Sequence, residues 1–207
     1  RLVDGRLELK TIGDAPAVGL CGSGILDTLA QLYLGGVVDK RGRMGEHPRV
    51  RDDGKHREFV IVGEDERPAG LGTEDGRESL ALTFTQKDVR ELQLAKGAMR
   101  TGIQVLLEAN ELTEKEIDKV IIAGAFGTYI DVTSAIAVGM LPRLPLDRFE
   151  QVGNAAGMGA KLALISQSMR DQARGMADRV SYIELATAPR FMQVFSQSMY
   201  LGEDLFG

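Results

Sequence analysis

The sequence predicts an α/β fold, and three observations support that prediction. Segments with the periodicity of long helices alternate with short apolar runs typical of strands. One run, Val120 to Ala123, is apolar throughout, which indicates a buried strand of a covered, largely parallel sheet. Glycine supplies 25 of the 207 residues, above the usual ~7%, and several glycines stand where a strand or loop passes into a helix.

Composition excludes several classes of protein. The single cysteine, Cys21, cannot form an internal disulfide or supply the ligands of an iron–sulfur cluster. The net charge of -5 argues against binding nucleic acid through bulk charge. No apolar run reaches the ~18 residues of a membrane span. We therefore expect a cytoplasmic protein without nucleic-acid or membrane partners. Because it begins at Arg1 rather than Met, we expect a piece of a longer polypeptide.

The first third of the chain predicts a strand followed by a helix. Apolar residues alternate at the start of Leu7 to Ile12, which predicts a strand. The run Cys21 to Gly24 leads directly into a helix that extends to Tyr33, and Gly35 and Gly36 end it. The expected inward face of this helix carries Ile25, Leu29 and Leu32.

Two polar stretches follow, and we expect both to be surface excursions of one domain that spans residues 1–207. Residues 39–58 are dense in charge and predict a loop or a small hairpin. Phe59 to Val62 predicts a short strand, and residues 63–79 form a second polar, glycine-containing loop.

The longest predicted helix begins after an extended segment, Leu80 to Phe84. Thr85 is its expected N-cap, and Asp88, three residues on, completes a variant of the capping box. The expected inward face carries Val89, Leu92, Ala95, Met99, Gly102 or Ile103, and Leu106. The opposite, polar face carries Arg90, Gln93, Lys96, Arg100 and Gln104.

The last third predicts further short elements. Thr113 and Glu116 form a capping box at a short turn, and Asp131 or Thr133 is expected to cap a helix. Later helices are expected at Gly153 to Ser166, Met169 to Asp178 and Pro189 to Tyr200, and a strand at Val180 to Leu185.

Two glycine clusters are candidates for ligand binding. Gly22, Ser23 and Gly24 stand at a helix start, where backbone N–H groups and the helix dipole favour an anion. Gly124, Ala125, Phe126 and Gly127 follow the apolar strand, where open α/β sheets bind ligands and small residues admit a flat ring. The second cluster matches neither the dinucleotide nor the Walker A pattern, and purely structural turns remain the alternative for both clusters.

The polar face of the long helix supplies two more candidates. Gln93 and Lys96, with Arg100, share one side of the helix at spacings of three and four. If this side borders a nucleotide, Lys96 is placed for a ribose or phosphate and Gln93 for the edge of the base. The alternative is an ordinary solvated face.

The order of these motifs resembles one known family. The resemblance rests on the runs Ala17 to Asp27, Leu82 to Ala98, Ile121 to Gly127, Gly153 to Ala156 and Tyr182 to Ala186. They are similar to the C-terminal part of the reductive activators of corrinoid proteins, which are ATP-dependent iron–sulfur proteins. The resemblance covers about residues 11–200, and the long-helix and glycine-turn motifs are its most specific parts.

This resemblance implies a fold and a function. The fold is α/β, of the ribonuclease H-like, actin-like ATPase (ASKHA) type. The activity is ATP-driven reduction of an inactive Co(II) corrinoid to Co(I), and ATP hydrolysis powers a conformational change that makes an uphill reduction possible. The turn from Gly124 to Gly127 matches the adenosine motif, Gln93 and Lys96 lie on the helix that flanks base and ribose, and Gly22 to Gly24 pass near the nucleotide cleft.

The resemblance also implies partners that this chain does not hold alone. The first phosphate loop and a cysteine-rich ferredoxin-like domain are not found, so ATP with Mg²⁺ would be shared with a missing lobe. A 2Fe–2S cluster would lie in the missing N-terminal domain. The expected partner is a corrinoid protein or corrinoid-dependent methyltransferase, and the expected assembly is a homodimer. We expect this chain to bind ATP weakly and to hydrolyse none, although the complete protein would be an ATP-hydrolysing activator.

Two alternatives stay open at this point. A related ATPase could activate another redox enzyme, such as a radical dehydratase. Alternatively, the chain could be a non-catalytic dimerisation or partner-docking module in which both glycine turns are structural.

Overall fold

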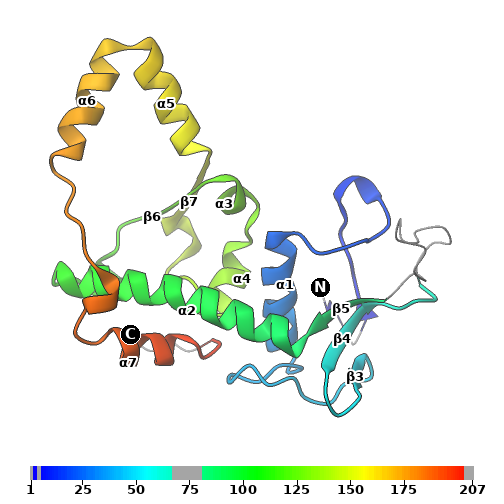
Figure 1. Cartoon of the computed structure of the whole chain (residues 1–207). Helices are drawn as coiled ribbons and strands as arrows, with labels where there is room; N and C mark the ends of the chain where they lie inside the picture. Colours follow the sequence, from blue (N-terminus) through cyan, green and yellow to red (C-terminus); the bar gives the residue numbers. More distant parts are fainter. Residues whose placement is uncertain (1, 4–5, 67–80, 203–207) are drawn as a thin grey trace.

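The computed structural model describes residues 2–3, 6–66 and 81–202 of the chain (Figure 1). Most of the predicted polar loop at 63–79, together with Leu80, lies outside these ranges. The helices are α1 (Gly22–Leu34), α2 (Gln86–Ala109), α3 (Ala125–Tyr129), α4 (Val132–Ala137), α5 (Ala155–Ile165), α6 (Gln167–Ala177) and α7 (Phe191–Ser198). The strands are β1 (Leu2–Val3), β2 (Arg6–Leu7), β3 (Val50–Asp52), β4 (Arg57–Val62), β5 (Leu82–Thr85), β6 (Val120–Ala123) and β7 (Phe149–Gly153).

The hydrophobic core lies where α1, the sheet β3-β4-β5 and the start of α2 meet. This sheet is antiparallel, with β4 in the middle and the pairs Val50↔Phe59 and Phe59↔Phe84 in register. The buried side chains of the core include Leu29 of α1 and Val89 of α2. The hairpin β3–β4 confirms the small hairpin predicted in the first polar stretch, and β4 begins two residues before the predicted strand.

The helix boundaries that depend on local signals are confirmed. Thr85 and Asp88 form a capping box at the start of α2, and Thr113 and Glu116 form another before the short 3-10 helix Glu114–Glu116. Asp131 caps α4, because its carboxylate accepts a hydrogen bond of 2.7 Å from the backbone N–H of Ser134. Each of these signals lies within four residues of the element it controls, so tertiary packing does not override it.

The predicted faces of α2 are wrong in the middle of the helix. Val89 is buried as expected, but Ala95, Met99 and Leu106 are exposed. The polar side chains of the opposite face are buried instead: Gln93, Lys96 and Arg100. The reason is tertiary, because α7 and the chain that follows it pack along this side of α2 and present main-chain carbonyls to it.

The parallel pairing predicted from the apolar run is confirmed, but its burial is not. β6 pairs in parallel with β7, a strand that the sequence reading missed. Within the described residues these two strands form their own sheet, and Ile121 of β6 is 62% exposed. This apolar strand therefore keeps an exposed face among the described residues.

Two predicted strands are also wrong. Of Leu7 to Ile12 only Leu7 is in a strand, β2, and a short 3-10 helix begins at Ile12. Val180 to Leu185 contains no strand, and a 3-10 helix begins at Leu185. Alternation over a few residues is a weak signal when no neighbouring strand lies beside the segment.

Helices α5 and α6 form a hairpin that projects from the rest of the chain (Figure 1). We call this hairpin, residues 155–177, the arm. Neither helix has a buried residue, although α5 is apolar except for Lys161. No helix within residues 2–3, 6–66 and 81–202 is long and apolar enough to cross a membrane.

Candidate functional site

Two glycine turns lie side by side at the carboxyl ends of β6 and β7. Gly124 follows β6 with φ 100°, and Gly153 ends β7 with φ 65°. The backbone N–H of Gly124 donates a hydrogen bond of 2.6 Å to the carbonyl of Gly153. Residues with a side chain rarely adopt these positive φ values, so both positions favour glycine. A helix begins directly after each turn, α3 after Gly124 and α5 after Asn154.

The first of these turns has both an open side and a tightly packed side. A Cβ placed on Gly124 would meet no atom within 4 Å, so the backbone faces open space there. A Cβ on Gly127 would lie 2.6 Å from Cγ2 of Ile122, so glycine lets α3 fold back against its own strand. Gly127 therefore has a structural reason to be glycine, whereas Gly124 combines a strained conformation with room for a ligand.

The structure brings the two predicted glycine clusters together. A Cβ on Gly22, at the start of α1, would lie 3.2 Å from the ring of Phe126. Phe126 thus packs against the first residue of α1 and is still 48% exposed. The exposed remainder of the ring, the turn at Gly124 and the start of α1 form one surface around the carboxyl ends of the parallel strands. Ligands bind outside this edge in open α/β sheets.

Cys21 caps the helix at this surface. Its Sγ accepts a hydrogen bond of 3.4 Å from the backbone N–H of Gly24 and lies 3.4 Å from Oγ of Ser23. The Ser23 hydroxyl is the main cause that lowers the pKa of the Cys21 thiol, and the Gly24 N–H adds to it. Cys21 is exposed, so it offers a natural chemical reporter beside Gly22 and Phe126.

Gln93 and Lys96 do not lie at this surface. Nε2 of Gln93 donates hydrogen bonds to the carbonyls of Met199 (2.9 Å) and Arg41 (3.2 Å). Nζ of Lys96, which is only 2% exposed, donates to the carbonyl of Tyr200. In this structure both side chains therefore fasten the segment after α7 onto α2. Their role in nucleotide binding stays a prediction.

Arg100 has a different partner on the same face of α2. Its guanidinium forms an ion pair with Glu114, and both side chains are buried. The sequence reading missed this pair, since Glu114 appeared only as part of a capped turn. This buried charge pair joins the C-terminal half of α2 to the segment before β6.

The residues at this surface fit part of a nucleotide and no more. Open backbone at Gly124 and a half-exposed aromatic ring suit a flat, uncharged group such as adenosine. Within the described ranges, no group of three or more His, Cys, Asp or Glu residues could hold a metal ion. Cys21 alone cannot hold a 2Fe–2S cluster.

The structure adds Gly153 and Asn154 to the site. Asn154 caps α5 through a hydrogen bond of 2.9 Å from the backbone N–H of Gly157. A sequence signal was available: the run Phe149 to Gly153 ends in glycine and is followed by an Asn cap, as at a strand-to-helix turn. The adjacent polar residues Glu150 and Gln151 obscured the strand.

The described residues form an α/β domain with paired glycine turns, and comparison with known families defines its class. Residues 3–206 match the family described as the C-terminal domain of RACo, the ASKHA domain. The chain belongs to this family, and the ASKHA fold expected from its motifs is confirmed.

Three similar proteins make the relationship more specific. The chain is 34% identical over 212 residues to the corrinoid activation enzyme RamQ of Eubacterium limosum, covering 98% of this chain and 34% of that protein. It is 24% identical over 186 residues to a Co(II) methylated amine-specific corrinoid protein reductase of Methanosarcina barkeri, covering 89% and 29%. A solved structure, a reductive activator for corrinoid, iron–sulfur protein, matches with a TM-score of 0.81 and 31% identity, covering 94% and 30%. The chain thus spans about a third of each relative.

Proposed function

We propose that this chain is part of an ATP-dependent activator that reduces a corrinoid protein from Co(II) to Co(I). The chain would supply the adenosine side of the nucleotide site. The observation that carries this proposal is the joint surface of Gly124, Phe126 and Gly22 at the carboxyl ends of two parallel strands. The names of the relatives support the corrinoid partner, because each describes activation or reduction of a corrinoid or a corrinoid protein.

Each residue of the surface has a defined part in the proposal. The open backbone at Gly124 lets a planar base approach, and the exposed part of the Phe126 ring offers it an apolar contact. α1 is a helix of 13 residues, and the backbone N–H groups at its start favour a negatively charged group of the ligand. ATP would supply the free energy of hydrolysis, while Mg²⁺ and the triphosphate need groups from outside this chain.

The proposal predicts weak ATP binding without hydrolysis by the 207-residue chain. We expect a dissociation constant of about 0.1–1 mM, because only one side of the nucleotide is held. ATP should also slow alkylation of Cys21 by iodoacetamide, since the thiol lies beside the proposed site. Calorimetry measures the first effect and mass spectrometry the second. ATPase turnover by this chain at the rate of a complete family member would contradict the proposal.

A pair of glycine variants tests the site directly. Gly124→Val places a branched side chain at φ 100° and into the open space, so ATP binding and the protection of Cys21 should both be lost. The control is Gly175→Val in α6, where the backbone is helical and a Cβ meets no neighbour. Equal ATP binding by both variants, with circular dichroism showing them folded, would exclude Gly124 from the site.

The corrinoid part of the proposal needs the remaining two-thirds of a relative. A chimera in which this chain replaces the matching region of the Eubacterium limosum protein should convert Co(II) to Co(I) corrinoid when ATP and a low-potential one-electron donor are both present. Anaerobic absorption spectroscopy follows this conversion. The Gly124→Val chimera should be inactive and the Gly175→Val chimera active. Binding of ATP without any corrinoid reduction would support the nucleotide site and contradict the proposed partner.

Gln93 and Lys96 enter the proposal as residues that could reach ribose and base only if the segment after α7 moves. Lys96→Met should then weaken ATP binding beyond its effect on folding.

Ion-mobility or sedimentation analysis can test the homodimer that the family resemblance implies.

A further inference from the structure

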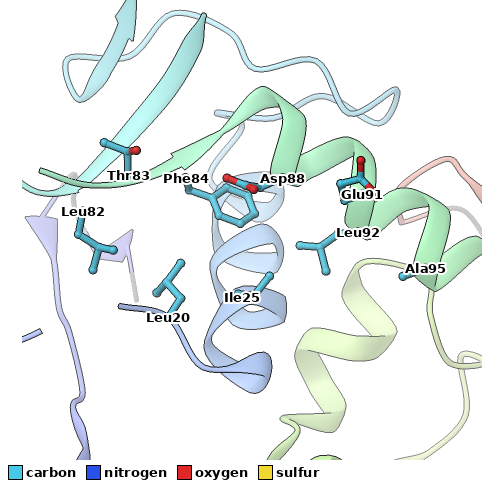
Figure 2. Close-up of a pocket in the computed structure, with 9 residues that line it drawn as sticks. All are labelled: Leu20, Ile25, Leu82, Thr83, Phe84, Asp88, Glu91, Leu92 and Ala95. Atoms are coloured by element: carbon cyan, nitrogen blue, oxygen red, sulfur yellow. The ribbon is translucent and has the colours of Figure 1, made fainter. Parts of the chain in front are cut away.

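A groove adjoins the start of α1 but shares none of its lining residues with the proposed nucleotide surface. It encloses about 430 Å³ between α1, β5 and α2 (Figure 2), a volume in the range of known ligand sites. Most of its lining is apolar: Leu20, Ile25, Leu82, Phe84, Leu92 and Ala95. The remaining lining residues are Thr83, Asp88 and Glu91.

The groove follows the edge of a strand. Leu82, Thr83 and Phe84 are consecutive in β5, and in Figure 2 Thr83 points away from the side taken by Leu82 and Phe84. A groove that touches three consecutive residues runs along the strand's edge, since alternate side chains lie on opposite faces. β4 occupies one edge of β5, and no strand within the described residues pairs with the other.

The polar residues of the groove have one sign of charge. Asp88 and Glu91 are one helical turn apart on α2 and lie along the same rim (Figure 2). The backbone N–H and the hydroxyl of Thr85 both donate hydrogen bonds to Oδ2 of Asp88. Lys87 and Arg90, their neighbours in sequence, do not line the groove. The groove therefore combines an apolar floor, an available strand edge and an acidic rim.

We propose that this groove binds an extended peptide segment of a partner protein that alternates apolar side chains with Lys or Arg. The segment pairs with the edge of β5, which supplies main-chain hydrogen bonds that do not depend on sequence. Its apolar side chains enter the groove between Leu20 and Leu92. Its basic side chains reach Asp88 and Glu91, which select against acidic segments. The proposal does not depend on nucleotide binding, because none of these residues belongs to that surface.

A matched pair of peptides tests the proposal with the 207-residue chain. One fluorescein-labelled hexapeptide alternates valine with lysine, and the other alternates valine with glutamate. Fluorescence anisotropy should show at least about tenfold tighter binding of the lysine peptide. Glu91→Lys should reduce that binding about tenfold or more, because it reverses charge on an exposed rim residue. Glu46→Lys, an exposed charge reversal outside the groove, should leave it unchanged.

Hydrogen exchange locates the peptide independently of its charge. Binding should slow exchange of the amides at residues 82–85 and leave β3, at the far edge of the sheet, unaffected. The proposal is overturned if neither peptide binds, if both bind equally, or if Glu91→Lys and Glu46→Lys behave alike. It is also overturned if residues 82–85 are already protected in a dimer that Glu91→Lys dissociates, because a second copy of the chain would then occupy the groove.

Discussion

Helices α1 and α5 both begin at a glycine-containing turn and both are rich in apolar residues, but they differ in how far they are buried. α1 buries Leu26, Leu29, Ala30 and Leu32 in the core beneath the sheet β3-β4-β5. α5 buries none of its residues, and Leu164 is 78% exposed. We call the described residues outside the arm the body. Similar apolar content therefore gives a packed helix in the body and an uncovered helix in the arm (Figure 1).

This difference shows that apolar content alone does not determine burial. A helix that is hydrophobic on all sides is normally enclosed by protein. The arm and the exposed face of β6 thus share one property, apolar surface without a covering layer among the described residues. If burial determines stability, a substitution in the rest of the chain should lower the free energy of unfolding more than a matched substitution in the arm.

The largest expected difference concerns two ion pairs. Arg100→Met leaves Glu114 buried without its guanidinium and should lower the free energy of unfolding by about 3–5 kcal/mol. Arg174→Met in the arm breaks an exposed pair with Asp171 and should cost under about 1 kcal/mol. Urea unfolding followed by circular dichroism measures both. Replacing Arg100 and Glu114 together by Met and Leu should recover much of the loss, and no recovery would argue against a simple buried pair.

The second prediction compares leucines. Leu29→Ala creates a cavity in the core and should cost about 2–5 kcal/mol. Leu164→Ala in the arm should change stability by no more than about 0.5 kcal/mol. The same urea titrations supply the numbers. A loss above about 2 kcal/mol for Leu164→Ala would contradict an uncovered arm. If that loss depended on protein concentration, it would indicate that a second copy covers it.

The sequence could predict features that depend on local signals, and it could not predict those that depend on contacts between distant segments. The start of α2 follows from Thr85 and Asp88, and the start of α4 from Asp131, since each signal acts within one turn. The burial of Gln93 and Lys96 could not be predicted this way. It depends on carbonyls of Met199 and Tyr200, over 100 positions further along the chain.

The candidate site divides in the same manner. Gly124 is recognisable because an apolar strand precedes it, and the resemblance to corrinoid activators identified the turn. Gly153, its neighbour across the sheet, was not chosen, since β7 contains Glu150 and Gln151 and resembles a polar loop. The contact between Gly22 and Phe126 joins residues from distant parts of the chain, and no local pattern indicates it.

Removing a helix cap should produce a smaller difference in stability between the body and the arm. Thr85→Ala removes the side-chain bonds at the start of α2 and should cost about 1 kcal/mol in global unfolding. Ser166→Ala removes the cap of α6, where Ser166 Oγ accepts from the N–H of Met169 at 3.3 Å. The arm variant should speed amide exchange within α6 only. A shift of the global unfolding midpoint by Ser166→Ala would show that the arm unfolds together with the body.

The smallest expected effect in free energy is electrostatic and lies at the start of α1. The Ser23 hydroxyl and the Gly24 N–H lower the pKa of Cys21, so the reactive thiolate forms at a lower pH than in an ordinary cysteine. Ser23→Ala removes the larger cause, so it should raise the pKa and slow alkylation by iodoacetamide at neutral pH. Ser168→Ala, which removes the corresponding hydroxyl contact of Ser166 in the arm, should leave the rate unchanged. The pH dependence of the alkylation rate measures each pKa. A Ser23→Ala profile that coincides with the unsubstituted chain would mean that the helix start, rather than the hydroxyl, governs the thiol.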